Sequence, residues 1–156
     1  SKVAIKVATQ HVIDAGLHTV GYQLCSIEEL LEEKPEPFDV ITCLEVLEHV
    51  PDPRAIIEAA QALVKPGGHV FLSTINRNPK AFAQLIVGAE YLLGLIPKGT
   101  HEYAKLIRPS ELAGWLRWAG LDLRDQRGIA YNPITRIARL NDDVSVNYIM
   151  HCTKES

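Results

Sequence analysis

FDVITCLEVLEHVPDP, residues 38–53, is the stretch of the sequence that decides the fold and carries most of its chemistry. Its first six residues form a short apolar run in which Val40, Ile41 and Thr42 are β-branched. Prolines at positions 35 and 37 precede this run. The pattern predicts a buried strand over residues 38–43.

Three ionisable residues follow this predicted strand directly. Glu45, Glu48 and His49 have the spacing i, i+3, i+4, which predicts that they share one face of a helical turn. In open α/β sheets, ligands bind at the carboxyl ends of the strands. Two carboxylates and an imidazole suit a divalent cation such as Mg²⁺. Acidic residues in a first helical turn also complement the helix dipole, and a single histidine there can simply be solvated, so both interpretations stay open.

The remaining sequence predicts helices and strands in alternation. Helices are expected over residues 1–15, 54–64 and 108–119, and Ser26 with Glu29 forms a capping box that opens another helix through Glu33. Gly16 is expected to end the helix over residues 1–15, and Asp52 is expected to cap the start of the helix over residues 54–64. Strands are expected over residues 19–24, 38–43, 70–74, 121–127 and 144–152, with turns at residues 131–133 and 141–143. The short links predict that strands 38–43 and 70–74 pair in parallel.

Composition narrows the range of functions. With 156 residues the chain fits a single domain. Its 16 basic and 19 acidic residues give a net charge of −3, which does not favour nucleic acid as a partner. Cys25, Cys43 and Cys152 are too widely spaced for a disulfide framework or a zinc site, so we expect small core residues in a reducing, intracellular protein. Residues 1–15 are amphipathic and do not have the pattern of a signal peptide.

The segment from Ala81 to Ile96 (residues 81–96) is apolar almost all round, interrupted only by Gln84 and Glu90. It is shorter than the roughly 20 residues that span a bilayer. A buried core helix is one interpretation. Because basic residues flank the segment, a helix lying on a membrane surface or closing over an apolar ligand is the other.

Four stretches resemble a known family. FDVITCLEVLEHVPDP, LVKPGGHVFLSTINRN, VGAEYLLGLIPKGTHEY and YNPITR closely resemble the ubiquinone biosynthesis O-methyltransferases of bacteria and mitochondria, and the similarity covers essentially the whole chain. A strand followed by E-x-x-E-H is common to many class I methyltransferases. GAEY, PKGTH and YNPIT are more specific for this family.

The resemblance implies an α/β fold with a class I methyltransferase (Rossmann-like) sheet of strand order 3-2-1-4-5-7-6. It implies transfer of a methyl group from S-adenosylmethionine to a phenolic oxygen of a polyprenylated ring, with help from Mg²⁺. Leu44 would contact the cofactor, while Glu45, Glu48 and His49 would bind Mg²⁺. A cation beside a phenol lowers a phenolic pKa that is ordinarily about 10. Glu45 and His49 are the expected catalytic residues, and His49 is either a ligand, which we favour, or the general base.

The resemblance also implies partners and a location. Asn76, Tyr131 and Asn132 are weaker candidates for the substrate pocket, because turn or capping roles suit them equally well. Residues 77–103 would form a lid that contacts the membrane through Ala81 to Ile96. The partners would be a polyprenylated phenol or quinol, the membrane surface and other ubiquinone-biosynthesis proteins, with the protein cytoplasmic and peripheral at the inner membrane. The alternatives are a non-catalytic lipid- or quinone-binding module derived from the family, or another metal-assisted methyltransferase of the same fold.

Family members begin with an N-terminal segment, followed by a strand, a glycine-rich turn that cradles the cofactor, and a second strand ending in an acidic residue. None of these occurs in this sequence, so we expect a sheet truncated at its N-terminus, without its first two strands. The strand at residues 38–43 would then have an exposed edge, which tends to pair with something. We expect it to pair with strand 19–24, to exchange elements with a second copy, or to belong to a piece of a longer protein.

Overall fold

A computed structural model describes residues 1–83, 102–132 and 135–155. The chain divides into two compact units, Ser1–Pro35 and Glu36–Ser156. The second unit contains the sheet and all the predicted site residues.

The first unit contains two helices, both of them predicted. α1 (Lys2–Asp14) is followed by Gly16, whose φ of +64° is a left-handed conformation that glycine adopts without strain. α2 (Ile27–Glu32) has the predicted capping box: the Glu29 amide donates to Ser26 Oγ at 3.2 Å, and the Ser26 amide donates to Glu29 Oε2 at 2.6 Å. Neither helix contains a buried residue.

The strand predicted over residues 19–24 is wrong. These residues form no strand, and Val20 and Leu24 are exposed. An extended segment becomes a strand only when a neighbour satisfies its backbone hydrogen bonds, and no residue of the first unit lies in a strand. The expected pairing of residues 19–24 with residues 38–43 is wrong for the same reason.

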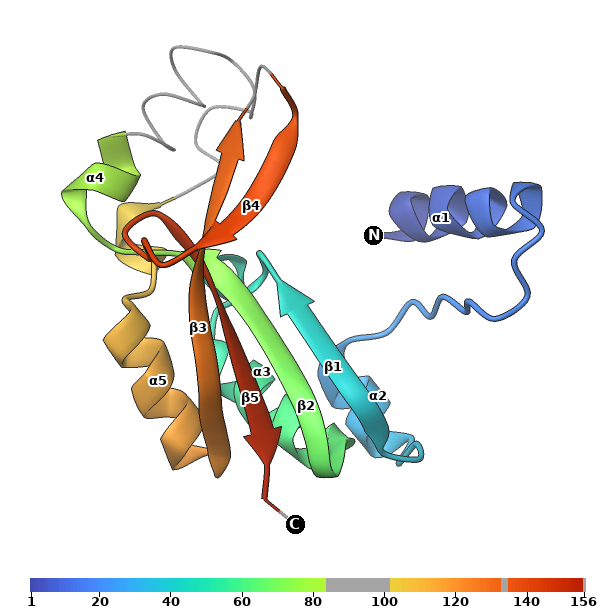
Figure 1. Ribbon diagram of the computed structural model, residues 1–156. Coiled ribbons are helices and arrows are strands. Elements are labelled where there is room, and N and C mark those ends of the chain that lie inside the picture. Colours follow the sequence, from blue (N-terminus) through green and yellow to red (C-terminus); the bar gives the residue numbers. More distant parts are fainter. Residues whose placement is uncertain (84–101, 133–134, 156) are drawn as a thin grey trace. The chain divides into compact units, whose positions relative to one another are not determined.

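The second unit contains a five-stranded sheet of order β1-β2-β5-β3-β4 (Figure 1). β1 (Phe38–Leu44) pairs in parallel with β2 (Val64–Ile75), which confirms the predicted parallel pair. β5 (Asn147–Lys154), β3 (Leu121–Asn132) and β4 (Ile137–Asn141) join as antiparallel neighbours. In the order of the sheet, β1, β2, β5 and β3 correspond to strands 4, 5, 7 and 6 of the expected class I order.

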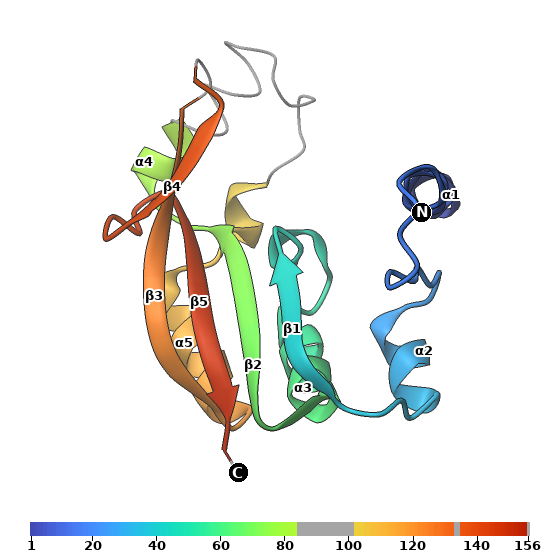
Figure 2. The same cartoon turned by 45° about the vertical axis from the view of Figure 1, so that its right-hand side comes forward.

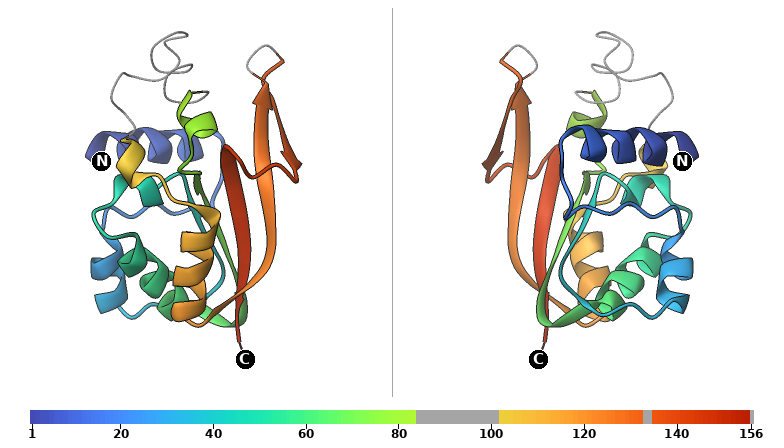
Figure 3. Two further views of the ribbon diagram at one scale, coloured as in Figure 1. Left: turned by 90° about the vertical axis from the view of Figure 1, so that its left-hand side faces the viewer. Right: turned by 90° about the vertical axis from the view of Figure 1, so that its right-hand side faces the viewer.

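Two helices cover one face of this sheet (Figures 1 and 3). α3 (Pro53–Leu63) connects β1 to β2, and α5 (Pro109–Trp118) precedes β3. The inner face of α5 contains Leu112 and Leu116, which are fully buried, and Trp115 packs against the same core. The sheet contributes alternate residues to this core: Val70, Leu72, Tyr148, Met150 and Cys152. Their side chains share one face because strand residues alternate between faces.

β1 is less buried than its apolar composition predicts. Phe38, Val40 and Leu44 are 41%, 50% and 49% exposed. Continuous apolar strands are typical of sheets covered on both faces, whereas the described helices of this unit cover one face. β1 is an edge strand of the sheet, as expected, and in the described parts of the chain its only strand neighbour is β2.

The closing part of the sheet is longer than predicted. β3 continues to Asn132 and forms a hairpin with β4, a strand that the sequence did not predict. All five residues of β4 are exposed, so they lack the alternating pattern of a half-buried strand. The turn predicted at residues 141–143 is confirmed, because the Asp143 amide donates to Asn141 Oδ1 at 3.0 Å. Figure 2 shows this hairpin extending beyond the rest of the sheet.

The predicted apolar helix at residues 81–96 lies largely outside the described residues. α4 (Pro79–Ala81), with Asn78 as its N-cap, ends at the first residue of this segment. The described helices are all too short or too polar to cross a membrane. Cys152 is buried as predicted, while Cys25 and Cys43 are half-buried, and all three thiols are free. Burial raises the pKa of Cys152 to about 12.

Candidate functional site

The predicted Glu/His stretch begins where β1 ends, at the carboxyl end of the parallel pair. Leu44 is the last residue of β1, and Glu45 follows with a left-handed φ of +54°. A single 3₁₀ turn, Leu47–His49, comes next. The expectation that one helical turn carries all three ionisable residues is therefore wrong, because Glu45 precedes the turn and has a different backbone conformation.

Glu45 is held by β2, which pairs with β1, and by β5, the strand on the far side of β2. Ser73 of β2 donates from Oγ to Glu45 Oε1 at 2.7 Å, and the Glu45 amide donates to the Ser73 carbonyl at 3.1 Å. Asn147 of β5 donates from Nδ2 to Glu45 Oε2 at 3.4 Å. These contacts fix a carboxylate at the end of the sheet where open α/β proteins bind ligands.

Glu48 is a buried carboxylate, with 3% of its surface exposed. Thr74 donates from Oγ1 to Glu48 Oε2 at 2.8 Å, while Glu48 Oε1 has no hydrogen-bond partner in the described structure. Burial raises the pKa of the Cys43 thiol, and the Glu48 carboxylate raises it further. Burying an oxygen atom without a hydrogen-bond partner costs free energy of folding. Functional groups in proteins commonly carry this cost.

The two carboxylates are attached to opposite faces of the sheet. Ser73 and Thr74 are successive residues of β2, and successive strand residues point to opposite faces. Glu45 accepts from Ser73, and Glu48 accepts from Thr74. His49 is exposed. Among the described residues, no three His, Cys, Asp or Glu side chains are grouped so as to hold a metal ion, so this arrangement does not fit one cation bound by all three predicted ligands.

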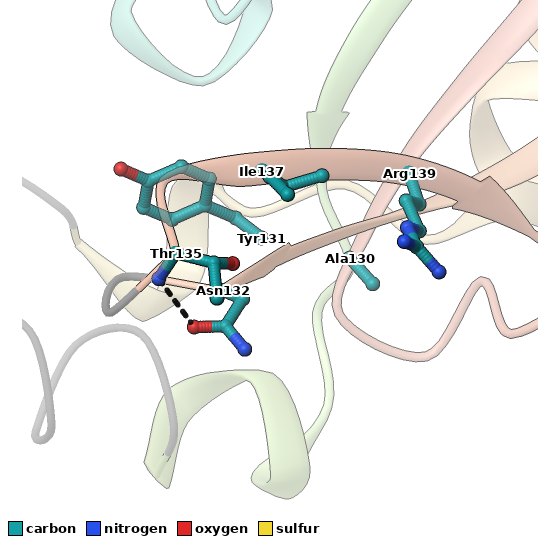
Figure 4. Close-up of a pocket in the computed structure, with 6 residues that line it drawn as sticks. All are labelled: Ala130, Tyr131, Asn132, Thr135, Ile137 and Arg139. Atoms are coloured by element: carbon teal, nitrogen blue, oxygen red, sulfur yellow. Dashed lines mark hydrogen bonds between the residues drawn. The ribbon is translucent and has the colours of Figure 1, made fainter.

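The weaker substrate candidates lie in two other places. Asn76 follows β2, and its Nδ2 donates to the Val144 carbonyl at 2.9 Å, which ties down the loop before β5. Tyr131 and Asn132 lie at the end of β3, where their side chains point to opposite sides of the strand (Figure 4). Asn132 Oδ1 accepts from the Thr135 amide at 3.1 Å. Asn76 and Asn132 thus have the turn-stabilising contacts that were the alternative to substrate binding.

Two hollows accompany these residues. One, of about 350 Å³, is formed by the hairpin and includes Tyr131, Ile137 and Arg139 (Figure 4). The other, of about 280 Å³, is lined by Leu47 and Val50 after β1 and by Trp115 of α5. Sequence reasoning found neither hollow. The first depends on β4, a strand that the sequence did not predict, and the second is built from segments far apart in the chain.

Sequence reasoning also missed the residues that hold the two carboxylates. Ser73, Thr74 and Asn147 lie 26 or more positions away from their acidic partners. The hydroxyl pair at the end of an otherwise apolar strand was the available signal. Polar side chains at the carboxyl end of a parallel strand are in the right place to support a site.

The comparisons define the class of protein. Residues 7–126 match the family described as a methyltransferase domain, and the chain belongs to this family. Solved structures agree on the fold: a SAM-dependent methyltransferase from Methanosarcina mazei has a TM-score of 0.66 at 17% identity, over 99% of this chain and 79% of that one. Magnesium protoporphyrin IX methyltransferase from Synechocystis has a TM-score of 0.62 at 15% identity, over 97% and 59%. The expected class I methyltransferase fold is confirmed.

Curated relatives are similar over nearly the whole chain. The ubiquinone biosynthesis O-methyltransferase of Leptothrix cholodnii is 56% identical over 153 residues, which are 98% of this chain and 65% of that protein. The protein of the same name from Stutzerimonas stutzeri is 54% identical over 152 residues, 97% of this chain and 65% of that protein. The chain spans just under two thirds of the length of these relatives.

Proposed function

We propose that this chain is part of an S-adenosylmethionine-dependent O-methyltransferase of ubiquinone biosynthesis, which methylates a phenolic hydroxyl of a polyprenylated ring. One observation carries the proposal: identity of 53–56% to proteins of that name over 96–98% of the chain. Identity at this level over a continuous domain supports a shared reaction, whereas the fold alone would not.

The anchored Glu45 carboxylate supports this chemistry. Methyl transfer to a phenol needs the phenolic proton removed and the oxygen aligned with the methyl group. Ser73 and Asn147 fix Glu45 at the carboxyl end of the parallel strands, which supports a role for Glu45 as the acceptor of that proton. His49, the alternative base, is exposed and lies four residues further along the chain. Leu44, half-exposed at the end of β1, is the proposed contact for the methyl donor.

A divalent cation is a separate part of the proposal. Glu45, Glu48 and His49 are its proposed ligands, and the carboxylate oxygens among them suit Mg²⁺. Binding would require Glu48 to leave Thr74 and turn toward Glu45, so we derive no catalytic step through the metal. Calorimetric titration with MgCl₂ tests this part. We expect heat of binding that Glu48→Gln abolishes, and an absence of heat in the folded protein would contradict metal binding.

Membrane contact is likewise proposed. The apolar composition of residues 81–96, with basic residues on both sides, supports contact with a membrane that holds a polyprenylated substrate. A peripheral position at the inner membrane and contact with other ubiquinone-biosynthesis proteins follow from the same proposal. Co-sedimentation with vesicles containing anionic lipid tests it, and recovery of all the protein in the supernatant would contradict it.

The central experiment measures methyl transfer from S-adenosylmethionine to a prenylated catechol. We expect Glu45→Gln to lower the rate by about 10²-fold or more, the usual contribution of a general base. Glu58→Gln, at an exposed position of α3, is the matched control and should leave the rate unchanged. A rate unaffected by Glu45→Gln would contradict the role of Glu45. If no transfer occurs but prenylated catechol still binds, the chain acts as the alternative quinone-binding module.

A further inference from the structure

The β3–β4 hairpin has one apolar face. Leu140 lies opposite Ile129, and Ala138 lies opposite Tyr131. Residues directly opposite each other in an antiparallel pair share a face. Tyr131 is 60% exposed and Leu140 is 64% exposed. We call these four residues the apolar lane: Ile129, Tyr131, Ala138 and Leu140.

The other face of the hairpin is more polar. It contains four residues: Ala130, Asn132, Ile137 and Arg139. The apolar lane contains no side chain that is charged at neutral pH, so covering it desolvates no charge. An exposed, continuous apolar surface of this kind marks a binding site more often than a plain surface.

The apolar lane begins beside the Glu45 site. Ile129 lies opposite Asn147 of β5, so the two side chains share a face of the sheet. Asn147 is also the residue that donates to Glu45 Oε2. The hairpin rises from the end of the sheet at which β1 terminates (Figure 1). The anchored carboxylate, Asn147 and the apolar lane therefore follow one another along one continuous face.

We propose that the apolar lane binds the isoprenoid tail of a phenolic substrate whose ring lies at Glu45. This inference rests on the proposed function, which supplies a ring with such a tail. An isoprenoid chain is an uncharged hydrocarbon, and placing it on Leu140 and Tyr131 removes apolar surface of both partners from water. Strand residues two apart are separated by about 7 Å, so the lane contacts the part of the tail nearest the ring.

The direct test uses farnesol, an isoprenoid alcohol without a ring, and needs neither methyl donor nor catalysis. Calorimetric titration of the chain should detect binding that Leu140→Ser weakens about tenfold, the usual effect of losing one leucine contact. Ile137→Ser is the matched control, because Ile137 is a 48% exposed aliphatic residue of the same strand on the opposite face. Both changes are at exposed positions, and equal melting temperatures would show that both variants fold.

A second arm compares catechol with catechol carrying one or two isoprene units as methyl acceptors. Leu140→Ser should raise KM for the prenylated acceptors about tenfold and leave kcat, and both constants for plain catechol, unchanged. Equal effects of Leu140→Ser and Ile137→Ser, or no farnesol binding, would overturn the inference. So would a change in sedimentation mass caused by Leu140→Ser without loss of farnesol binding, because a second copy would then cover the lane. Absence of methyl transfer to any acceptor would count against the proposed function. The farnesol titration would still show whether the apolar lane binds an isoprenoid chain.

Discussion

Thr74 stabilises the buried end of β2 through one hydroxyl group. Its Oγ1 donates to Glu48 Oε2 at 2.8 Å. This is the only hydrogen bond to the Glu48 carboxylate in the described part of the chain. Thr74→Val keeps the shape of the side chain but leaves a buried carboxylate unsatisfied. We expect the free energy of unfolding to fall by about 1–3 kcal/mol in urea denaturation. Thr74→Ser retains the hydroxyl and is the control, and an equal loss in both variants would mean that packing, not the hydrogen bond, is responsible.

His151 makes stability depend on pH. Its Nε2 lies 2.9 Å from His69 Nδ1, and its ring stacks on Phe71 with a centroid distance of 4.6 Å. Burial lowers the pKa of His151, the charge of His69 and that of Arg124 lower it further, and Asp125 opposes them. Because the folded state then binds fewer protons than the unfolded state, this contribution is complete above about pH 6.5 and is lost as the pH falls.

The expected result is a lower free energy of unfolding at about pH 5.5 than at about pH 7.5. His151→Gln should reduce this difference, since it removes the group that titrates. Urea denaturation of both proteins at the two pH values measures it. An unchanged pH dependence in the variant would assign the effect to other groups.

At the scale of elements, α3 depends on its N-cap. Asp52 Oδ1 accepts from the Arg54 amide at 2.9 Å, and Pro53 occupies the first turn, where its missing N–H does no harm. Asp52→Ala should lower the free energy of unfolding by about 1 kcal/mol. Asp52→Asn keeps a capping oxygen and should retain most of the stability in the same urea titration. Equal losses would show that the charge of Asp52, rather than the cap, matters.

At the scale of the whole molecule, the two units differ in how much they bury. α1 and α2 contain no buried residue, while Leu72 of β2 and Met150 of β5 are fully buried in the second unit. Short helices without tertiary contacts are marginal in water. We expect amide hydrogens of α1 to exchange orders of magnitude faster than those of Leu72 and Met150, as measured by NMR hydrogen exchange. Comparable protection in both units would contradict this expectation.

The exposed edge of β1 also belongs to this scale. Pairing with residues 19–24 is wrong, so exchange of elements with a second copy stays a prediction. Sedimentation analysis tests it. A stable dimer supports exchange between copies, and a monomer at all concentrations contradicts it.

Local patterns determined the elements whose hydrogen bonds are local. Ser26 and Glu29 are three residues apart, so the capping box of α2 was visible in the sequence. The parallel pairing of β1 and β2 was also predictable, because a strand, a helix and a strand joined by short links leave few topologies. β4 was not predictable, since its exposed residues carry no burial pattern.

The sequence by itself determined the α/β class, the capped helices and the position of the ionisable stretch after β1. Only the tertiary structure decided how that stretch is arranged. Glu45 and Glu48 are close in sequence, yet Ser73 and Thr74 hold them on opposite faces of the sheet. The physical reason is that spacing along the chain fixes neighbours only within a regular helix. Once Glu45 adopts a left-handed φ, partners from distant strands decide where each carboxylate lies.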